Sequence, residues 1–164
     1  MGRNTTVLVI DDSAVWRKII RKRLKDLGFI IVGEAADGQD GVGKYISLKP
    51  DLVTMDIEMP TMDGLAATKR ILEIDPCARI IIVSSKGDES TVRKALLIGA
   101  IDFIGKASIS KVWDSKLKKY VKKAGYSQTF KKIAGYIKDI KPAKLLAMIV
   151  SKYSARRKKD GYGD

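Results

Sequence analysis

Residues 7–13 read VLVIDDS: four apolar residues, two aspartates and a serine. A continuous apolar, β-branched run predicts a strand that is buried on both faces of a parallel sheet. Ser13 suits a helix N-cap, because its hydroxyl can accept a hydrogen bond from the first turn. The stretch therefore predicts a strand, a short acidic loop and a helix that runs to about Leu27. The side chains expected on one face of that helix are Val15, Ile19, Ile20, Leu24 and Leu27.

The same strand-then-helix pattern recurs along the next ninety residues. Further strands are expected at 30–35, 52–56, 79–84 and 101–105, with helices at about 39–48, 64–73 and 89–98. Alternation of this kind, with short connections, predicts an α/β domain with a parallel sheet and helices on both faces.

Polar residues stand where the predicted strands end: Asp11, Asp12, Asp56, Ser84 and Lys106. Ligand sites of open parallel sheets lie beyond the carboxyl ends of the strands, so these side chains should converge. Any one aspartate could simply cap a helix or form a turn, but that reading does not explain their common edge. Crowded carboxylates favour a hard divalent cation such as Mg²⁺. A carboxylate beside Mg²⁺ can also act as a nucleophile towards phosphorus.

Four motifs carry a resemblance to a known family: VLVIDDS (7–13), VTMDIEMPTMDG (53–64), IIIVSS (80–85) and GAIDFIGK (99–106). On these motifs, residues 5–107 resemble response-regulator receiver domains, in particular the single-domain chemotaxis type. The stretch 83–106 is also similar to receivers attached to chemotaxis methylesterases. The resemblance implies a doubly wound, flavodoxin-like sheet of five parallel strands in the order 2-1-3-4-5. It assigns residues 1–124 to one receiver domain.

The resemblance also implies a metal site and a phosphoacceptor. Asp56 would accept the phosphoryl group from the phosphohistidine of a histidine kinase. Asp12 would bind Mg²⁺ directly, and Asp11 would act mostly through a water molecule. Asp56 and the backbone carbonyl of Glu58 would complete the protein ligands.

Three further residues match the parts of a switch. Ser84 stands at the position of the switch hydroxyl, Phe103 at that of the switch aromatic, and Lys106 at that of the phosphate-binding lysine. Phosphorylation would draw Ser84 towards the phosphoryl group and let Phe103 rotate inward into the space behind it. The expected function is therefore the switching of protein docking, for example to a flagellar or motility component. The site would catalyse its own phosphorylation and dephosphorylation only, so no other enzymatic turnover is expected.

Two departures from the family pattern concern the loops around the site. Ala107 follows Lys106 where the family usually has a proline with a cis peptide bond. Because a cis bond before alanine costs about 2.5–4 kcal/mol, a trans bond and an altered loop are expected. Glu58 and Lys86 would flank the phosphoryl group, pair across its mouth and shield it from water. We therefore expect slow self-dephosphorylation.

The positive charge belongs to the end of the chain. Residues 1–107 carry 16 Lys/Arg and 15 Asp/Glu, whereas residues 108–164 carry 16 and 4, so that the net charges are +1 and +12. A helix is expected over 111–124, and a basic helical extension over 125–164. That extension could be a solvated face, or it could bind nucleic acid, an anionic membrane surface or an acidic protein. The alternative function is accordingly a phosphorylation-controlled transcription regulator that binds DNA through these helices.

Composition excludes several other classes. One cysteine and no histidine exclude an internal disulfide, Cys–His catalysis and histidine metal sites. No apolar stretch approaches the roughly 20 residues that span a bilayer, so a cytoplasmic protein is expected. A hydrolase that uses Asp56 on a small phosphoester is disfavoured, because no cap domain and no second general acid stand near it.

Overall fold

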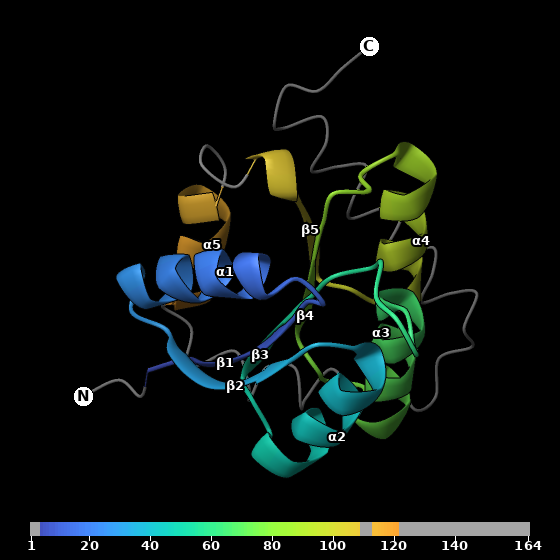
Figure 1. Cartoon of the computed structure of the whole chain (residues 1–164), viewed down its shortest axis with the longest axis horizontal. Coiled ribbons are helices and arrows are strands. Elements are labelled where there is room, and N and C mark those ends of the chain that lie inside the picture. Colours follow the sequence, from blue (N-terminus) through green and yellow to red (C-terminus); the bar gives the residue numbers. More distant parts are fainter. Residues whose placement is uncertain (1–3, 109–112, 122–164) are drawn as a thin grey trace. The chain divides into compact units, whose positions relative to one another are not determined.

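Five strands alternate with helices in the computed structural model of the chain, which describes residues 4–108 and 113–121 (Figure 1). The strands are β1 (Thr6–Ile10), β2 (Ile30–Ala35), β3 (Leu52–Met55), β4 (Ile80–Ser84) and β5 (Asp102–Gly105). The helices are α1 (Ala14–Asp26), α2 (Gly38–Leu48), α3 (Gly64–Ile74), α4 (Glu89–Ile98) and α5 (Trp113–Val121), with a 3₁₀ turn, η1 (Lys106–Ser108), between β5 and α5. The predicted element order is confirmed. The predicted bounds differ by one or two residues at several ends.

The sheet has the predicted order, β2-β1-β3-β4-β5, and each of its pairings is parallel. The register brings the strand ends level, because Ile10 of β1 pairs with Met55 of β3, and Met55 pairs with Ile82 of β4. Ser84 then pairs with Gly105 of β5. The residues that follow β1, β3 and β5 therefore emerge at one edge of the sheet.

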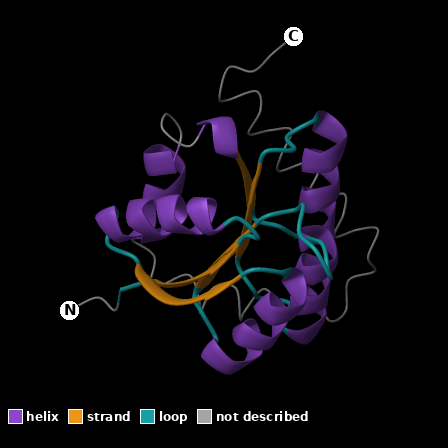
Figure 2. Cartoon of the chain, in the orientation of Figure 1, coloured by secondary structure: helices purple, strands orange, loops and turns teal. Residues whose placement is uncertain are grey.

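Helices cover both faces of the sheet (Figure 2). Side chains alternate along a strand, so Val7 and Val9 of β1 join the core beneath α1 and α5, whereas Leu8 and Ile10 join the core beneath α2, α3 and α4. Val7, Leu8, Val9 and Ile10 of β1 are at most 1% exposed, so this part of the strand is buried on both of its faces. A rigid scaffold of this kind fixes where the loops at its edge begin.

Helices α1, α2, α3 and α4 each begin directly after an N-cap residue. Ser13, Asp37, Asp63 and Asp88 each accept a hydrogen bond from the backbone N–H three residues on, at 2.8–3.4 Å. Asp37 is thus the N-cap and Gly38 the first residue of α2.

One predicted core position is wrong. Val15 is 66% exposed, although the spacing placed it on the buried face of α1. The side chains of α1 that are buried against the sheet, Ile20 and Leu24, belong to its later turns. The first turn lies next to the acidic loop that follows β1.

The chain after β5 follows the expected course as far as it is described. No cis peptide bond occurs in the described residues, so Lys106–Ala107 is trans as predicted, and it opens η1. Trp113 and Leu117 of α5 are fully buried beside α1. The extension predicted for 125–164 and its boundary lie outside the described residues. Within residues 4–108 and 113–121, no helix is both long and apolar enough to cross a membrane.

Candidate functional site

Three aspartates meet at the edge of the sheet, as the sequence predicted. Asp11 and Asp12 follow β1, Asp56 follows β3, and one carboxylate oxygen from each lies within 4.8 Å of the others. Asp11 is fully buried and Asp56 is 4% exposed, whereas Asp12 is open to solvent. The cluster thus has two buried carboxylates and one at the surface.

Lys106 reaches this cluster from the end of β5. Its Nζ lies 2.8 Å from Oδ2 of Asp11 and donates a hydrogen bond to Oδ2 of Asp56 at 2.9 Å. Burial raises the pKa of Asp11, the contact with Lys106 opposes that rise, and the charge of Asp56 adds to it. Burial alone would lower the pKa of Lys106, but its contacts with Asp11 and Asp56 outweigh burial and raise it overall. The ammonium therefore stays charged between two carboxylates.

The backbone around Asp56 is held on both sides. Its N–H donates to the carbonyl of Ile10 at 2.9 Å, and its Oδ1 accepts from the N–H of Ile57 at 2.8 Å. The N–H of Gly64 closes the loop by donating to the carbonyl of Ile57 at 2.8 Å. A Cβ at Gly64 would lie 1.7 Å from the carbonyl oxygen of Asp56, so only glycine fits this approach.

The predicted switch residues lie on β4 and β5. Ser84 is 1% exposed at the end of β4, and its Oγ accepts from the N–H of Lys86 at 3.1 Å. Its O–H remains a donor. Phe103 is 8% exposed in the core beneath α4, close enough to Gly87 that a Cβ there would lie 3.6 Å from the ring. Whether these two side chains move together stays a prediction.

Glu58 and Lys86 form the ion pair that the sequence suggested. Their Oε1 and Nζ atoms are 3.5 Å apart, and both side chains are more than half exposed. The pair joins the loop after β3 to the loop after β4. The role expected for the Glu58 backbone carbonyl as a metal ligand stays a prediction.

Sequence reasoning missed two residues in the first turns of α1. Arg17 donates from Nη1 to the carbonyls of Asp11 (2.7 Å) and Asp12 (3.1 Å), and its Nε lies 3.5 Å from Oε2 of Glu34 on β2. The ring of Trp16 lies over Lys106, with Nζ 5.2 Å from the ring centroid. Their position directly after an acidic loop was the available signal.

The donor set fits Mg²⁺. Three carboxylates face one ammonium, which leaves the cluster a net negative charge that a divalent cation would balance. The donors are hard oxygen atoms, and the exposed carboxylate of Asp12 leaves room for the water ligands that Mg²⁺ keeps. Asp11, Asp12 and Asp56 are the side chains that would hold it.

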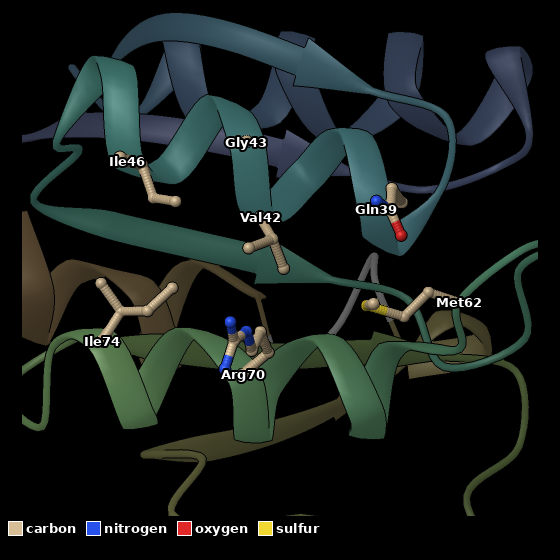
Figure 3. Close-up of a pocket in the computed structure, with 7 residues that line it drawn as sticks. All are labelled: Gln39, Val42, Gly43, Ile46, Met62, Arg70 and Ile74. Carbon is tan, nitrogen blue, oxygen red and sulfur yellow. The ribbon is translucent and has the colours of Figure 1, made fainter.

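A separate hollow lies between α2 and α3, with a volume of about 270 Å³ (Figure 3). Its lining residues are Gln39, Val42, Gly43, Ile46, Met62, Arg70 and Ile74. Arg70 supplies its sole charged group, and Glu73 lies 3.2 Å from that guanidinium. The hollow therefore brings together no group for acid–base or metal chemistry, unlike the acidic edge of the sheet.

Comparisons with known proteins agree with the fold. The family model for the response regulator receiver domain matches residues 7–122, and the chain belongs to that family. Chemotaxis protein CheY of Thermotoga maritima is 46% identical over 106 residues, which cover 65% of this chain and 87% of that protein. CheY of Treponema pallidum is 49% identical over 107 residues, which cover 64% and 74%.

Among solved structures, the CheX–CheY–BeF₃–Mg²⁺ complex of Borrelia burgdorferi contains a chain that is 38% identical, with a TM-score of 0.67. The match covers 72% of this chain and 90% of that one. The response regulator domain of Thermotoga maritima CheB is 40% identical, with a TM-score of 0.61, and the match covers 71% and 93%. This chain is therefore the receiver domain of a two-component response regulator, with relatives of the CheY type.

Proposed function

We propose that the chain is a phosphorylatable switch, which takes a phosphoryl group on Asp56 from a histidine kinase with Mg²⁺ bound at Asp11, Asp12 and Asp56. The observation that carries the proposal is the cluster of three carboxylates with Lys106 at the edge of the sheet. We propose that this function is carried out in the cytoplasm, together with the histidine kinase that donates the phosphoryl group.

The transfer uses the residues in separate roles. A carboxylate oxygen of Asp56 attacks phosphorus, the O–P bond forms, and the N–P bond of the phosphohistidine breaks with its electron pair left on the imidazole nitrogen. Bound Mg²⁺ supplies neutralisation of the charge that gathers on the phosphoryl oxygens. Lys106 pairs with one of these oxygens as a point charge.

The switch would follow from the new charge. A phosphoryl group adds nearly two negative charges and three acceptor oxygens, and the O–H of Ser84 can donate to one of them. Movement of Ser84 would free space for Phe103 and alter the surface of β4, β5 and α4. Phosphorylation shifts the equilibrium between the original and the altered form only to the extent that it stabilises the altered form more than the original one.

The output we propose is docking to a protein of a chemotaxis or motility system. Support comes from the relatives named chemotaxis protein CheY and from a related chain solved in a complex with CheX. The proposed role is signalling and not turnover of a separate substrate.

Intact mass tests the chemistry directly. The full chain is incubated with Mg²⁺ and acetyl phosphate, beside Asp56→Asn and beside a sample treated with a chelator. We expect a gain of one phosphoryl mass in the wild type, and no gain in the other two. A gain that survives Asp56→Asn would move the acceptor to another residue and refute the assignment.

The second candidate is a transcription regulator, favoured by the 16 Lys/Arg against 4 Asp/Glu of residues 108–164. Phosphate contacts by basic residues would give DNA binding that weakens steeply with salt. The test compares the DNA affinity of the full chain with that of a chain ending at residue 124. Absence of DNA binding by the full chain would leave protein docking as the function.

A further inference from the structure

Trp16 contacts the ammonium of the site from α1. Lys106 Nζ lies 5.2 Å from the centroid of the Trp16 ring, within the distance at which a cation is attracted to an aromatic face. The backbone N–H of Trp16 donates to the N-cap side chain of Ser13 at 3.4 Å, which fixes the residue in the first turn next to the acidic loop. The ring is partly buried, and Lys106 beneath it is 5% exposed.

The other contacts of Lys106 are with groups that take part in the proposed chemistry. Asp11 and Asp56 hold the ammonium from the side of the acidic cluster, at 2.8 and 2.9 Å. Both of these carboxylates change role when a metal binds and when Asp56 becomes an acyl phosphate. The Trp16 ring has no such role, so it can hold the ammonium before and after the transfer.

The chain that carries Lys106 provides little support of its own. Lys106 begins η1, and the next residues, Ala107 and Ser108, are exposed. A lysine side chain is flexible and has several rotatable bonds, so its direction depends on what it packs against. The contact with Trp16 of α1 therefore restricts the direction of the Lys106 ammonium, which the loop that carries Lys106 does not restrict.

We propose that Trp16 is a positioning residue of the phosphorylation site, which keeps the Lys106 ammonium directed at the phosphoryl group and covers it from solvent. This inference rests on the proposed function of Asp56. It adds a residue from α1 whose contribution is made through Lys106 alone. Because a cation–π contact at a partly buried site is modest, the expected effect on the phosphorylation rate is about three- to tenfold.

The first test compares full-length variants in a time course of intact mass with Mg²⁺ and acetyl phosphate. Trp16→Leu should be phosphorylated about three- to tenfold more slowly, while Trp16→Phe keeps an aromatic face and recovers most of the rate. Val15→Ala is the matched control, because Val15 is the neighbouring exposed side chain on the same turn. A Trp16→Leu rate equal to that of the wild type would overturn the inference and leave the function of Asp56 standing. A wild type that gains no phosphoryl mass would overturn both.

The second test does not require the Leu variant to fold. The chain has two tryptophans, Trp16 and Trp113, and Trp113 is fully buried among apolar residues beside α1. Subtracting the fluorescence emission of Trp16→Phe from that of the wild type isolates the emission of Trp16, whose ring senses a nearby cation. Lys106→Met, made in both backgrounds, should change this difference, because the ring then lies beside no cation. A difference that Lys106→Met leaves unchanged, when acetyl phosphate does phosphorylate the wild type, would refute the contact in solution.

Discussion

Lys106 Nζ and Asp56 Oδ2 are 2.9 Å apart, and both side chains are 5% exposed. The same Nζ is 2.8 Å from Oδ2 of buried Asp11. One ammonium therefore lies between two buried carboxylates, and its removal would leave both without a counter-charge.

The first prediction concerns the loss of that ammonium. Lys106→Met leaves two buried carboxylates without a counter-charge, so we expect a loss of about 3 kcal/mol in the free energy of unfolding. Urea unfolding in the presence of a chelator measures it. Mg²⁺ should restore part of the loss, because it neutralises the same carboxylates. Lys86→Met is the control, since this lysine is 55% exposed and its pair should contribute less than about 1 kcal/mol. Equal losses in both variants would contradict the buried-charge argument.

The second prediction concerns Arg17, which holds the carbonyls of Asp11 and Asp12 in place. Arg17→Met keeps most of the apolar stem and removes the hydrogen bonds. Residues that orient metal ligands typically change metal affinity by about 10- to 100-fold, so we expect a loss of this order for Mg²⁺, measured by calorimetric titration. Arg21→Met is matched to it, because Arg21 pairs with Glu34 at 2.8 Å. If Arg21→Met weakened Mg²⁺ binding as much, the effect would come from Glu34 and not from the carbonyl contacts.

The third prediction concerns the pair that spans the mouth of the site. Glu58→Asn and Lys86→Ala should each shorten the lifetime of the phosphorylated chain, because either change opens a path for water to Asp56. The loss of phosphoryl mass after removal of the donor gives the lifetime. Salt should shorten the lifetime of the wild type as well, since an exposed pair is screened. Arg93→Ala breaks a similar exposed pair on α4, with Glu89 at 3.1 Å, and should leave the lifetime unchanged. A wild-type half-life of seconds that neither substitution alters would refute the shielding role.

The fourth prediction contrasts two glycines. Gly64→Ala forces a methyl group onto the carbonyl of Asp56, so the loop must shift at a cost of about 3 kcal/mol, and phosphorylation should slow with it. Gly43 lies inside α2 with open space around its Cβ position, so Gly43→Ala should stabilise the chain by up to about 1 kcal/mol. Thermal unfolding of both variants measures the two effects. Destabilisation by Gly43→Ala would contradict the helix-propensity argument, and a Gly64→Ala chain as stable as the wild type would contradict the close approach.

Much of this architecture could be predicted from the sequence because it depends on local rules. Apolar runs marked the strands, and Ser13 marked the start of α1. The convergence of Asp11, Asp56 and Lys106 followed from parallel strand order alone. Val15 could not be placed correctly, because helical periodicity says which residues share a face but not how far along the helix the core extends.

The contacts that prediction missed depend on side-chain reach. Arg17 turns back to the loop before its own helix, and Trp16 reaches a lysine 90 residues later in the chain. The spacing of residues along the sequence does not predict either of these side-chain directions. The Glu58–Lys86 pair was foreseen because both residues lie at matching distances beyond neighbouring strands.

The strand order also has a consequence for the protein during its synthesis. Asp11 and Asp56 follow β1 and β3, which neighbour each other in the sheet, but Lys106 follows the edge strand β5. A chain emerging from the ribosome thus carries its acidic residues long before their ammonium is made. Until β5 is translated and joins the sheet, the nascent chain has the carboxylates of Asp11 and Asp56 without the ammonium of Lys106. The complete switch therefore cannot form on an incomplete chain.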